Sequence, residues 1–279
     1  MTHRFRTSPA LPQRVLRRAD LLADGMTTRM LTRAVRDGLL VRPRRGHYLP
    51  PEAHPDLVEA VRCGGRLDCV SLLERVGVFV CDPLGTHVQL DPDASRVPVP
   101  AAGVVRHWRA TDAHPDDALT PWVEALVQAV LCQTPRAAIA TLDSAWHLGI
   151  VGEAEIAEIF RTLPRAYRRL RPLLDRRAES GTETLVRLLL RGLGIRPELQ
   201  VSIDGVGRVD LVVDGWLIIE CDSREHHSSW DAVRADRRRD AVAAALGYTT
   251  IRLLAEDILS RPEWVSDILR RAVRTRGRS

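Results

Sequence analysis

Three carboxylates occur in two strongly hydrophobic segments, RVDLVV and WLIIECD. Asp210 lies in the first segment, and Glu220 and Asp222 close the second. Side chains alternate along a strand, so Glu220 and Asp222 are expected on one face and Cys221 on the other. Clustered carboxylates repel each other and raise each other's pKa, so such a set needs a divalent cation or arginines. Because the ligands are oxygens, we expect Mg²⁺ or Mn²⁺ in preference to zinc.

The chain contains no lysine, because all 41 residues of its Lys+Arg total are arginine. A Walker A loop and a Schiff-base lysine are therefore excluded, and any site must use carboxylates, histidines and arginines. Residues 1–50 hold 11 arginines and 3 acidic residues, a net charge of +8. Residues 51–150 carry −6 and residues 151–279 carry +3. Basic ends around an acidic middle are expected of a chain that meets a polyanion.

The elements that must position the carboxylates follow from periodicity and turn residues. A helix is predicted from Glu179 to the glycines at 192 and 194, and a strand at 199–203. The two hydrophobic segments form a hairpin around Asp214-Gly215, and a helix at about 230–246 and a strand at 249–253 follow. The order predicts an α/β sandwich with the carboxylates at one sheet edge.

These residues resemble the DUF559 group of the PD-(D/E)xK nuclease superfamily, whose closest characterised relatives are the very-short-patch-repair endonucleases. The resemblance covers Glu179 to Ile258. Its pieces are ES-x-x-E (Glu179, Ser180, Glu183), R-x-D-L (Arg208, Asp210), I-E-C-D (Glu220, Asp222), His227, D-R-R-R-D (Asp236 to Asp240) and G-Y-T-T-I-R (Gly247 to Arg252).

The resemblance implies a restriction-endonuclease-like α/β sandwich that hydrolyses phosphodiester bonds with Mg²⁺ or Mn²⁺. Asp210 and Glu220 would be metal ligands, joined by the carbonyl of Cys221, and Glu183 would hold a metal-bound water. Asp222 stands where the usual nuclease has lysine, which is the main departure from the pattern. The relatives use a histidine a few residues further on as general base, and His227 has the equivalent spacing.

Either Arg239 or Arg252 could hold the scissile phosphate by charge-assisted hydrogen bonds. The alternative is a fold that has lost catalysis, in which arginines pair with the three carboxylates. The survival of all three carboxylates together with His227 favours activity.

The first fifty residues predict a winged helix-turn-helix. A helix is expected at 11–23, a second from Thr27 to Asp37-Gly38, and then a hairpin with strands at 39–42 and 47–49. In such a domain the second helix enters the major groove and the wing reaches phosphate or the minor groove. The arginines expected to contact DNA are Arg29, Arg33 and Arg36 on the helix and Arg44 and Arg45 at the hairpin tip.

This front end resembles the winged-helix domain of AbiEi-type antitoxins and related transcription regulators. Its alternative interpretation is a small helical module that binds protein through a solvated basic face. We therefore expect one of two functions: a metal-dependent endonuclease acting on double-stranded DNA, or an AbiEi-like antitoxin or regulator whose nuclease-like domain is inactive.

The fold class expected for the whole chain is multi-domain α+β. The predicted segments are a winged helix at 1–52, a small β-containing segment at 53–118 with strands at 76–80, 86–90 and 104–108, a helical connector at 119–177, the nuclease-like domain at 178–270 and a basic tail at 271–279. No apolar run is long enough for a membrane span and no signal peptide is recognised, so a cytoplasmic protein is expected.

The remaining cysteines and histidines predict no further site. Five cysteines without a CxxC pair indicate reduced thiols in place of a disulfide framework or a zinc knuckle (Cys63, Cys69, Cys81, Cys132 and Cys221). Surface or core positions are expected for six histidines (His47, His54, His87, His107, His114 and His147).

Overall fold

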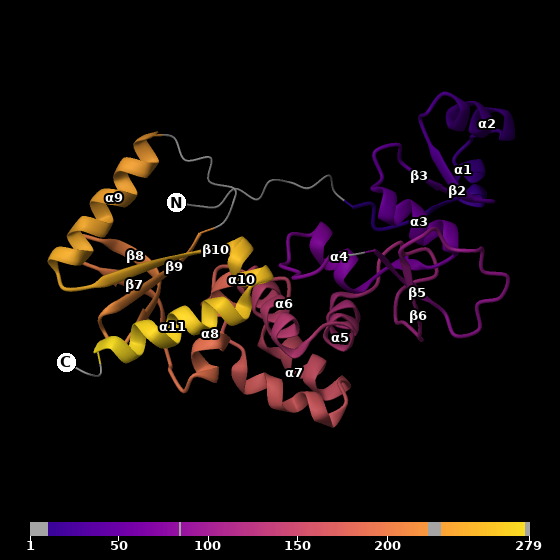
Figure 1. The fold of residues 1–279 in the computed structure, drawn as a ribbon. Helices are drawn as coiled ribbons and strands as arrows, with labels where there is room; N and C mark the ends of the chain where they lie inside the picture. The colour runs from indigo at the N-terminus through magenta and orange to yellow at the C-terminus, as the bar shows by residue number, and fades with distance from the viewer. Residues whose placement is uncertain (1–10, 84, 223–229, 277–279) are drawn as a thin grey trace. The chain divides into compact units, whose positions relative to one another are not determined.

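The computed structural model describes residues 11–83, 85–222 and 230–276 and has a mixed α/β fold, as the sequence predicts (Figure 1). Two compact units divide the chain: residues 1–133 with 151–165, and residues 134–150 with 166–279. The shorter segments expected from the sequence are not tested by this coarser division and stay predictions. None of the described helices is both long and apolar enough to cross a membrane.

The first unit begins with a winged helix whose three-stranded sheet has the order β1-β3-β2. Its elements are β1 (Leu16–Arg17), α1 (Arg18–Ala23), α2 (Thr28–Arg36), β2 (Val41–Arg44) and β3 (His47–Leu49). The hydroxyl of Thr27 caps α2 by accepting from the Met30 N–H at 3.2 Å, as its sequence position predicts.

Two details of this domain correct the sequence prediction. The helix expected at 11–23 is wrong in its first half, because residues 16–17 pair with β3 and α1 begins only at Arg18. The turn is also shorter than expected, since β2 extends to Arg44 and leaves Arg45 and Gly46 at the tip. Gly46 has φ of +80°, which a two-residue hairpin turn requires.

The rest of the first unit surrounds a second three-stranded sheet of order β4-β5-β6. Its elements are α3 (Pro55–Cys63), β4 (Arg66–Leu67), α4 (Cys69–Arg75), β5 (Thr86–Leu90), β6 (Val104–Trp108), α5 (Trp122–Cys132) and α7 (Glu153–Thr162). The strands expected at 86–90 and 104–108 are confirmed, and they pair in parallel. The strand expected at 76–80 is wrong, because α4 ends there in a turn at Gly77, whose φ is +84°.

The second unit contains a four-stranded sheet of order β10-β9-β8-β7. Its elements are α6 (Pro135–His147), α8 (Gly181–Gly192), β7 (Glu198–Ile203), β8 (Gly207–Val213), β9 (Leu217–Asp222), α9 (Trp230–Ala245), β10 (Thr249–Leu254), α10 (Ala255–Ser260) and α11 (Pro262–Arg276). A 3-10 helix, η1 (Arg165–Leu173), links the two units in sequence.

The side chains of β9 alternate between the two faces of this sheet, and different helices pack on each face. Leu217 and Ile219 pack in a core that includes residues of α8 and α11, whereas Ile218 packs with Ala243 of α9. Glu220 follows the same alternation and belongs to the α9 face. The carboxylate positions are therefore set by the hydrophobic pattern that precedes them in the strand.

A buried ion pair joins α6 to α8 within the second unit. Asp143 and Arg187 are 1% and 3% exposed, and Arg187 Nη2 donates to Asp143 Oδ2 at 2.8 Å. The Thr184 hydroxyl donates to the same oxygen at 2.9 Å, and the Asp175 N–H donates to Oδ1 at 2.8 Å. The Asp143 carboxylate thus accepts hydrogen bonds from a buried guanidinium, a hydroxyl and a backbone amide at once.

Replacement of this carboxylate should destabilise the protein strongly. We expect Asp143→Ala to lower the free energy of unfolding by about 3–5 kcal/mol, because it leaves the Arg187 charge buried without a partner. Asp267→Ala removes the partner of the half-exposed Arg270 and should cost no more than about 1 kcal/mol. Urea unfolding of the two variants measures the difference, and equal losses would contradict it.

Candidate functional site

Where the β8–β9 ladder ends, the side-chain carboxylates of Asp210 and Glu220 accept hydrogen bonds from backbone amides of the opposite strand. The paired residues of these strands run from Val213–Leu217 to Leu211–Ile219. Beyond them, the Asp210 N–H donates to Glu220 Oε2 at 3.2 Å and the Cys221 N–H donates to Asp210 Oδ2 at 2.8 Å. Each carboxylate therefore takes the place of a backbone carbonyl as the acceptor for an amide of the neighbouring strand. One oxygen of each carboxylate is fixed by this bond.

Burial makes these carboxylates weak acids. Glu220 is 7% exposed, and burial together with the charge of Asp210 raises its pKa to about 7, although Arg239 and Arg252 oppose the rise. Burial also raises the pKa of Asp210, as does the charge of Asp222. A proton or a cation at this pair is consequently favoured near neutral pH.

Glu183 lies at the start of α8, close enough for the charge of Asp210 to act on it. Burial and then that charge raise the Glu183 pKa to about 7. Its Oε2 accepts from the Glu179 N–H at 3.0 Å and from Gln200 Nε2 at 2.8 Å. The hydroxyl of Ser180 accepts from the Glu183 N–H at 3.2 Å and caps the helix.

Gln200 is a site residue that the sequence analysis missed. It lies in β7 with φ of +54°, an uncommon conformation for a residue other than glycine, and its amide fixes the Glu183 carboxylate. The only available signal was a polar residue in a strand segment that alternates apolar and polar residues. A glutamine at such a position has several structural explanations, so the sequence could not single it out.

The two arginines expected to hold phosphate already have protein partners. Arg239 of α9 donates from Nη2 to Glu220 Oε1 at 3.3 Å and to the Arg208 carbonyl at 2.8 Å. Arg252 of β10 binds both oxygens of Asp240, at 2.9 and 3.2 Å, and lies 3.4 Å from Asp222 Oδ1. Both guanidinium groups border the carboxylates, as the sequence analysis expects, and their roles toward a substrate stay predictions.

The donor atoms fit a hard divalent cation only in part. Asp210 Oδ1 and Glu220 Oε1 are the oxygens that the backbone amides leave over, and oxygen ligands suit Mg²⁺ or Mn²⁺. Within the described ranges, no third Asp, Glu, His or Cys donor joins this pair within 4.8 Å. A cation would therefore complete its shell with carbonyl oxygens, such as that of Cys221, and with water. His227, the expected general base, lies outside the described residues.

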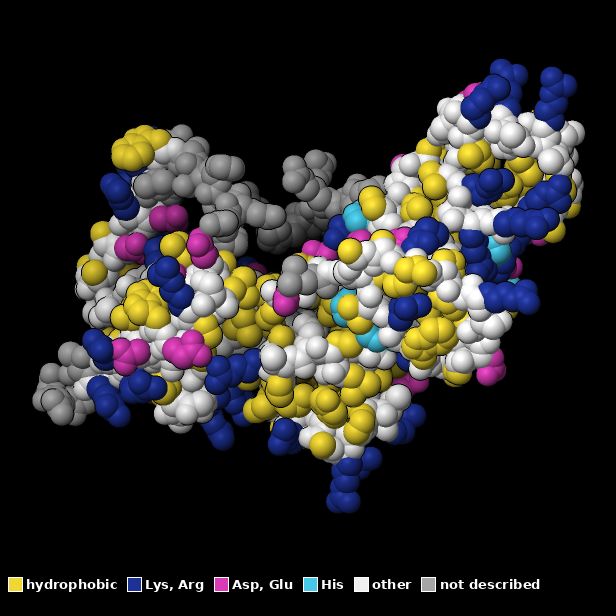
Figure 2. Space-filling model, turned by 45° about the vertical axis from the view of Figure 1, so that its right-hand side comes forward, with side chains coloured by type: hydrophobic (Ala, Val, Ile, Leu, Met, Phe, Trp, Pro, Cys, Tyr) yellow, Lys and Arg dark blue, Asp and Glu magenta, His cyan; other side chains and the backbone are white. Residues whose placement is uncertain are grey.

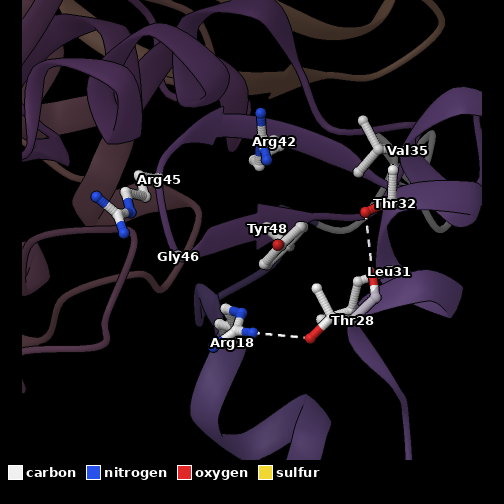
Figure 3. Close-up of a pocket in the computed structure, with 9 residues that line it drawn as sticks. All are labelled: Arg18, Thr28, Leu31, Thr32, Val35, Arg42, Arg45, Gly46 and Tyr48. Carbon is white, nitrogen blue, oxygen red and sulfur yellow. Dashed lines mark hydrogen bonds between the residues drawn. The ribbon is translucent and has the colours of Figure 1, made fainter.

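The winged helix presents a second candidate site, a pocket between α2 and the β2–β3 hairpin (Figure 3). Arg42 and Arg45 come from the hairpin, Arg18 from α1, and the hydroxyls of Thr28 and Thr32 from α2. Arg18 Nη2 donates to the Thr28 hydroxyl at 2.8 Å. Three guanidinium groups and the Thr28 hydroxyl make a set of donors suited to a phosphate, whereas the Thr32 hydroxyl donates to the Thr28 carbonyl at 3.0 Å.

The other arginines of the winged helix differ in whether they already pair with groups of the protein. Figure 2 shows arginine side chains projecting from the part of the molecule that carries α2. Arg29, Arg33 and Arg36 are exposed as expected, although the latter two both pair with Asp37, at 3.2 and 3.0 Å.

Arg44 is held by the protein itself. Its Nη2 lies 2.8 Å from His47 Nε2, its guanidinium lies against Gly64, and burial lowers its pKa. Of the two arginines predicted at the hairpin tip, Arg45 lines the pocket and Arg44 does not. Arg18 and Arg42 line it although the sequence analysis did not select them. Arg18 is brought to the hairpin by the pairing of β1 with β3, which is not local in sequence.

The raised pKa of Glu183 predicts a pH-dependent stability. A buried carboxyl with a folded pKa of about 7 stabilises the fold below its ordinary pKa of 4.5, and the contribution is lost as pH rises through 7. Glu183→Gln stays neutral and can accept the same two hydrogen bonds. We therefore expect the variant to gain about 2 kcal/mol relative to the wild type between pH 5 and pH 8.

Urea unfolding at the two pH values measures this gain. Glu198→Gln, on the exposed side of β7, is the matched control and should show no such change. A constant difference between Glu183→Gln and the wild type at both pH values would contradict the assignment.

Comparison with known proteins relates the chain to a bacterial family. Residues 13–51 match a family model described as transcriptional regulator, AbiEi antitoxin. Two uncharacterized proteins of Mycobacterium tuberculosis, MT2308 of strain CDC 1551 / Oshkosh and Rv2248 of strain ATCC 25618 / H37Rv, are each 30% identical over 258 residues, covering 85% of this chain and 93% of theirs. The chain therefore belongs to the family of these mycobacterial proteins, and its N-terminus is a domain of the AbiEi antitoxin and transcriptional-regulator type.

Proposed function

We propose that the protein is a DNA-binding, metal-dependent endonuclease. The observation that carries this proposal is the interlocked pair Asp210 and Glu220, beside Glu183, with both glutamate pKa values raised to about 7. Buried carboxylates that repel one another where strands end lower the stability of a fold. Such a cluster with raised pKa values is typical of a catalytic site. The resemblance to very-short-patch-repair endonucleases rests on the same residues.

Each residue of the site has a proposed role. Asp210 and Glu220 would hold Mg²⁺ or Mn²⁺ with the carbonyl of Cys221, and the metal would supply Lewis-acid polarisation of the phosphate. Glu183 would orient the attacking water, and its pKa of about 7 suits proton exchange near neutral pH. Arg239 would exchange its contact with Glu220 for the scissile phosphate. His227 remains the candidate general base.

Double-stranded DNA is the proposed substrate because the chain begins with a regulator-type winged helix. In that domain α2 would enter the major groove, and the pocket formed with the hairpin would hold a backbone phosphate. Phosphate contacts of this kind give affinity without sequence information, so they suit a nuclease and a regulator equally.

A second candidate function is an AbiEi-like antitoxin or transcriptional regulator with an inactive nuclease-like domain. The observation that favours it is the pairing of Arg239 with Glu220 and of Arg252 with Asp222, at 3.3 and 3.4 Å. These contacts neutralise part of the acidic charge without a metal. The two functions differ in whether the carboxylates act on DNA.

Cleavage assays separate the two functions. We expect the wild type to nick supercoiled plasmid or cut mismatched or single-stranded oligonucleotides with Mg²⁺ or Mn²⁺. Glu220→Gln and Asp210→Asn should reduce the rate at least about 100-fold, because metal-assisted charge stabilisation is worth several kcal/mol. Glu198→Gln should cut like the wild type. Absence of cleavage by the wild type on every substrate would favour the regulator.

DNA affinity tests the winged helix independently of cleavage. We expect Arg42→Ala/Arg45→Ala to weaken binding of duplex DNA about tenfold and to lower the slope of log affinity against log salt by about 2, one unit per phosphate contact. Arg161→Ala/Arg165→Ala removes the same charge from exposed positions of the same unit. Fluorescence anisotropy across a salt series measures both variants, and equal effects would argue against a contact at the pocket.

A further inference from the structure

The first unit gathers two cysteines and two histidines from four different elements. Cys69 begins α4, His87 lies in β5, His107 lies in β6, and Cys132 ends α5. One donor atom of each lies within 4.8 Å of the donor atoms of the other three. In the described part of the chain, no other set of three or more His, Cys, Asp or Glu side chains meets this condition.

The separations agree with one tetrahedral ion. His87 Nδ1 lies 3.0 Å from His107 Nε2, and Cys132 Sγ lies 3.8 Å from the same nitrogen. Zinc bonds of about 2.0–2.1 Å to nitrogen and 2.3 Å to sulfur place tetrahedral ligands about 3.3–3.8 Å apart. The two measured separations therefore lie close to the edges of such a tetrahedron.

We propose that Cys69, His87, His107 and Cys132 form a structural zinc site. Two thiolates and two neutral imidazoles balance the charge of Zn²⁺, so the loaded site carries no net charge into the interior. A mixed set of two sulfurs and two nitrogens in tetrahedral arrangement selects zinc over the magnesium-like ions proposed for the second unit. Four protein ligands close the site, which is typical of a structural role.

Surrounding contacts prepare the ligands for a metal. Gln128 Nε2 donates to Cys132 Sγ at 3.3 Å. Such outer contacts orient the ligands of metal sites.

A buried carboxylate stands beside the cluster. Asp68, which precedes Cys69, is fully buried and accepts from the Thr120 hydroxyl at 2.7 Å and from Arg109 Nη2 at 2.9 Å. Its second oxygen has no hydrogen-bond partner among the described residues. This buried carboxylate therefore lies next in sequence to a ligand of the proposed ion and is held in place by Arg109 and Thr120.

The proposed ion would join four elements that already pack or pair with one another. Helix α4 packs against α5 and β5, and β5 pairs with β6. The ligands lie at the start of one helix, the end of the other and in both strands. Cys69 holds a φ of +55°, an unfavourable conformation for a residue other than glycine, and metal binding would offset its cost.

Metal analysis of the purified full chain tests the proposal. We expect about one zinc per chain by plasma mass spectrometry. After removal of zinc, added Co²⁺ should give the visible absorption of a tetrahedral ion and a thiolate-to-cobalt charge-transfer band in the near ultraviolet. This spectrum needs no variant, so it tests the site even if substitutions unfold the chain.

Variants then identify the ligands. Cys132→Ser and His107→Gln should weaken zinc binding by at least the 10–100-fold that loss of an outer contact costs. Cys81→Ser removes a thiol outside the cluster, and Glu220→Gln alters the carboxylate site, so both should keep one zinc. Failure of the wild type to bind zinc or cobalt, unchanged affinity in Cys132→Ser, or a Cys69–Cys132 disulfide in the purified metal-free chain would overturn the proposal.

Discussion

Two backbone-to-carboxylate hydrogen bonds, from the Asp210 N–H to Glu220 and from the Cys221 N–H to Asp210, fix the geometry on which the carboxylate site depends. A hairpin normally satisfies its backbone amides across the ladder, but here two side-chain carboxylates take over where the ladder ends. The same bonds that orient the carboxylates also hold β8 and β9 together at this edge. Loss of one carboxylate would therefore free a backbone amide as well as a site oxygen, which is why amide replacements test chemistry better than alanine.

In a chain without lysine, the buried carboxylates that form ion pairs rely on arginine. Asp143 pairs with Arg187, and Asp68 pairs with Arg109, at 2.8 and 2.9 Å. A guanidinium is planar and carries five donors, so one arginine can bind a carboxylate and still satisfy other acceptors. Arg239 illustrates this, since it joins Glu220 to the backbone carbonyls of Val206, in the turn before β8, and of Arg208. The arginines thus serve as cross-links inside the fold as well as a basic surface.

The sequence predicted elements with strong periodicity and failed where non-local pairing decides the structure. The paired apolar strands around Asp214-Gly215 and the capped helix at Ser180 have local signals, and the structure contains both. Residues 16–17 carry an apolar pattern that also fits a helix, and only their partner strand makes them β1. Gln200 has no local signal at all, because its importance lies in its reach to Glu183 across the fold.

The cysteine and histidine cluster shows the same limit in a sharper form. Its ligands are separated by 18, 20 and 25 residues, from 69 to 87, 107 and 132, so none of the short spacings that mark zinc motifs occurs. Parallel pairing of β5 with β6 and packing of α4 on α5 are what bring them together. The expectation of unligated thiols and histidines rested on local spacing alone.

Donor chemistry separates this cluster from the carboxylate site, since sulfur and imidazole favour zinc while buried carboxylate oxygens favour Mg²⁺ or Mn²⁺. The two proposed sites would therefore take different ions from a mixture, and zinc held in the first unit would leave the carboxylates of the second free to exchange theirs.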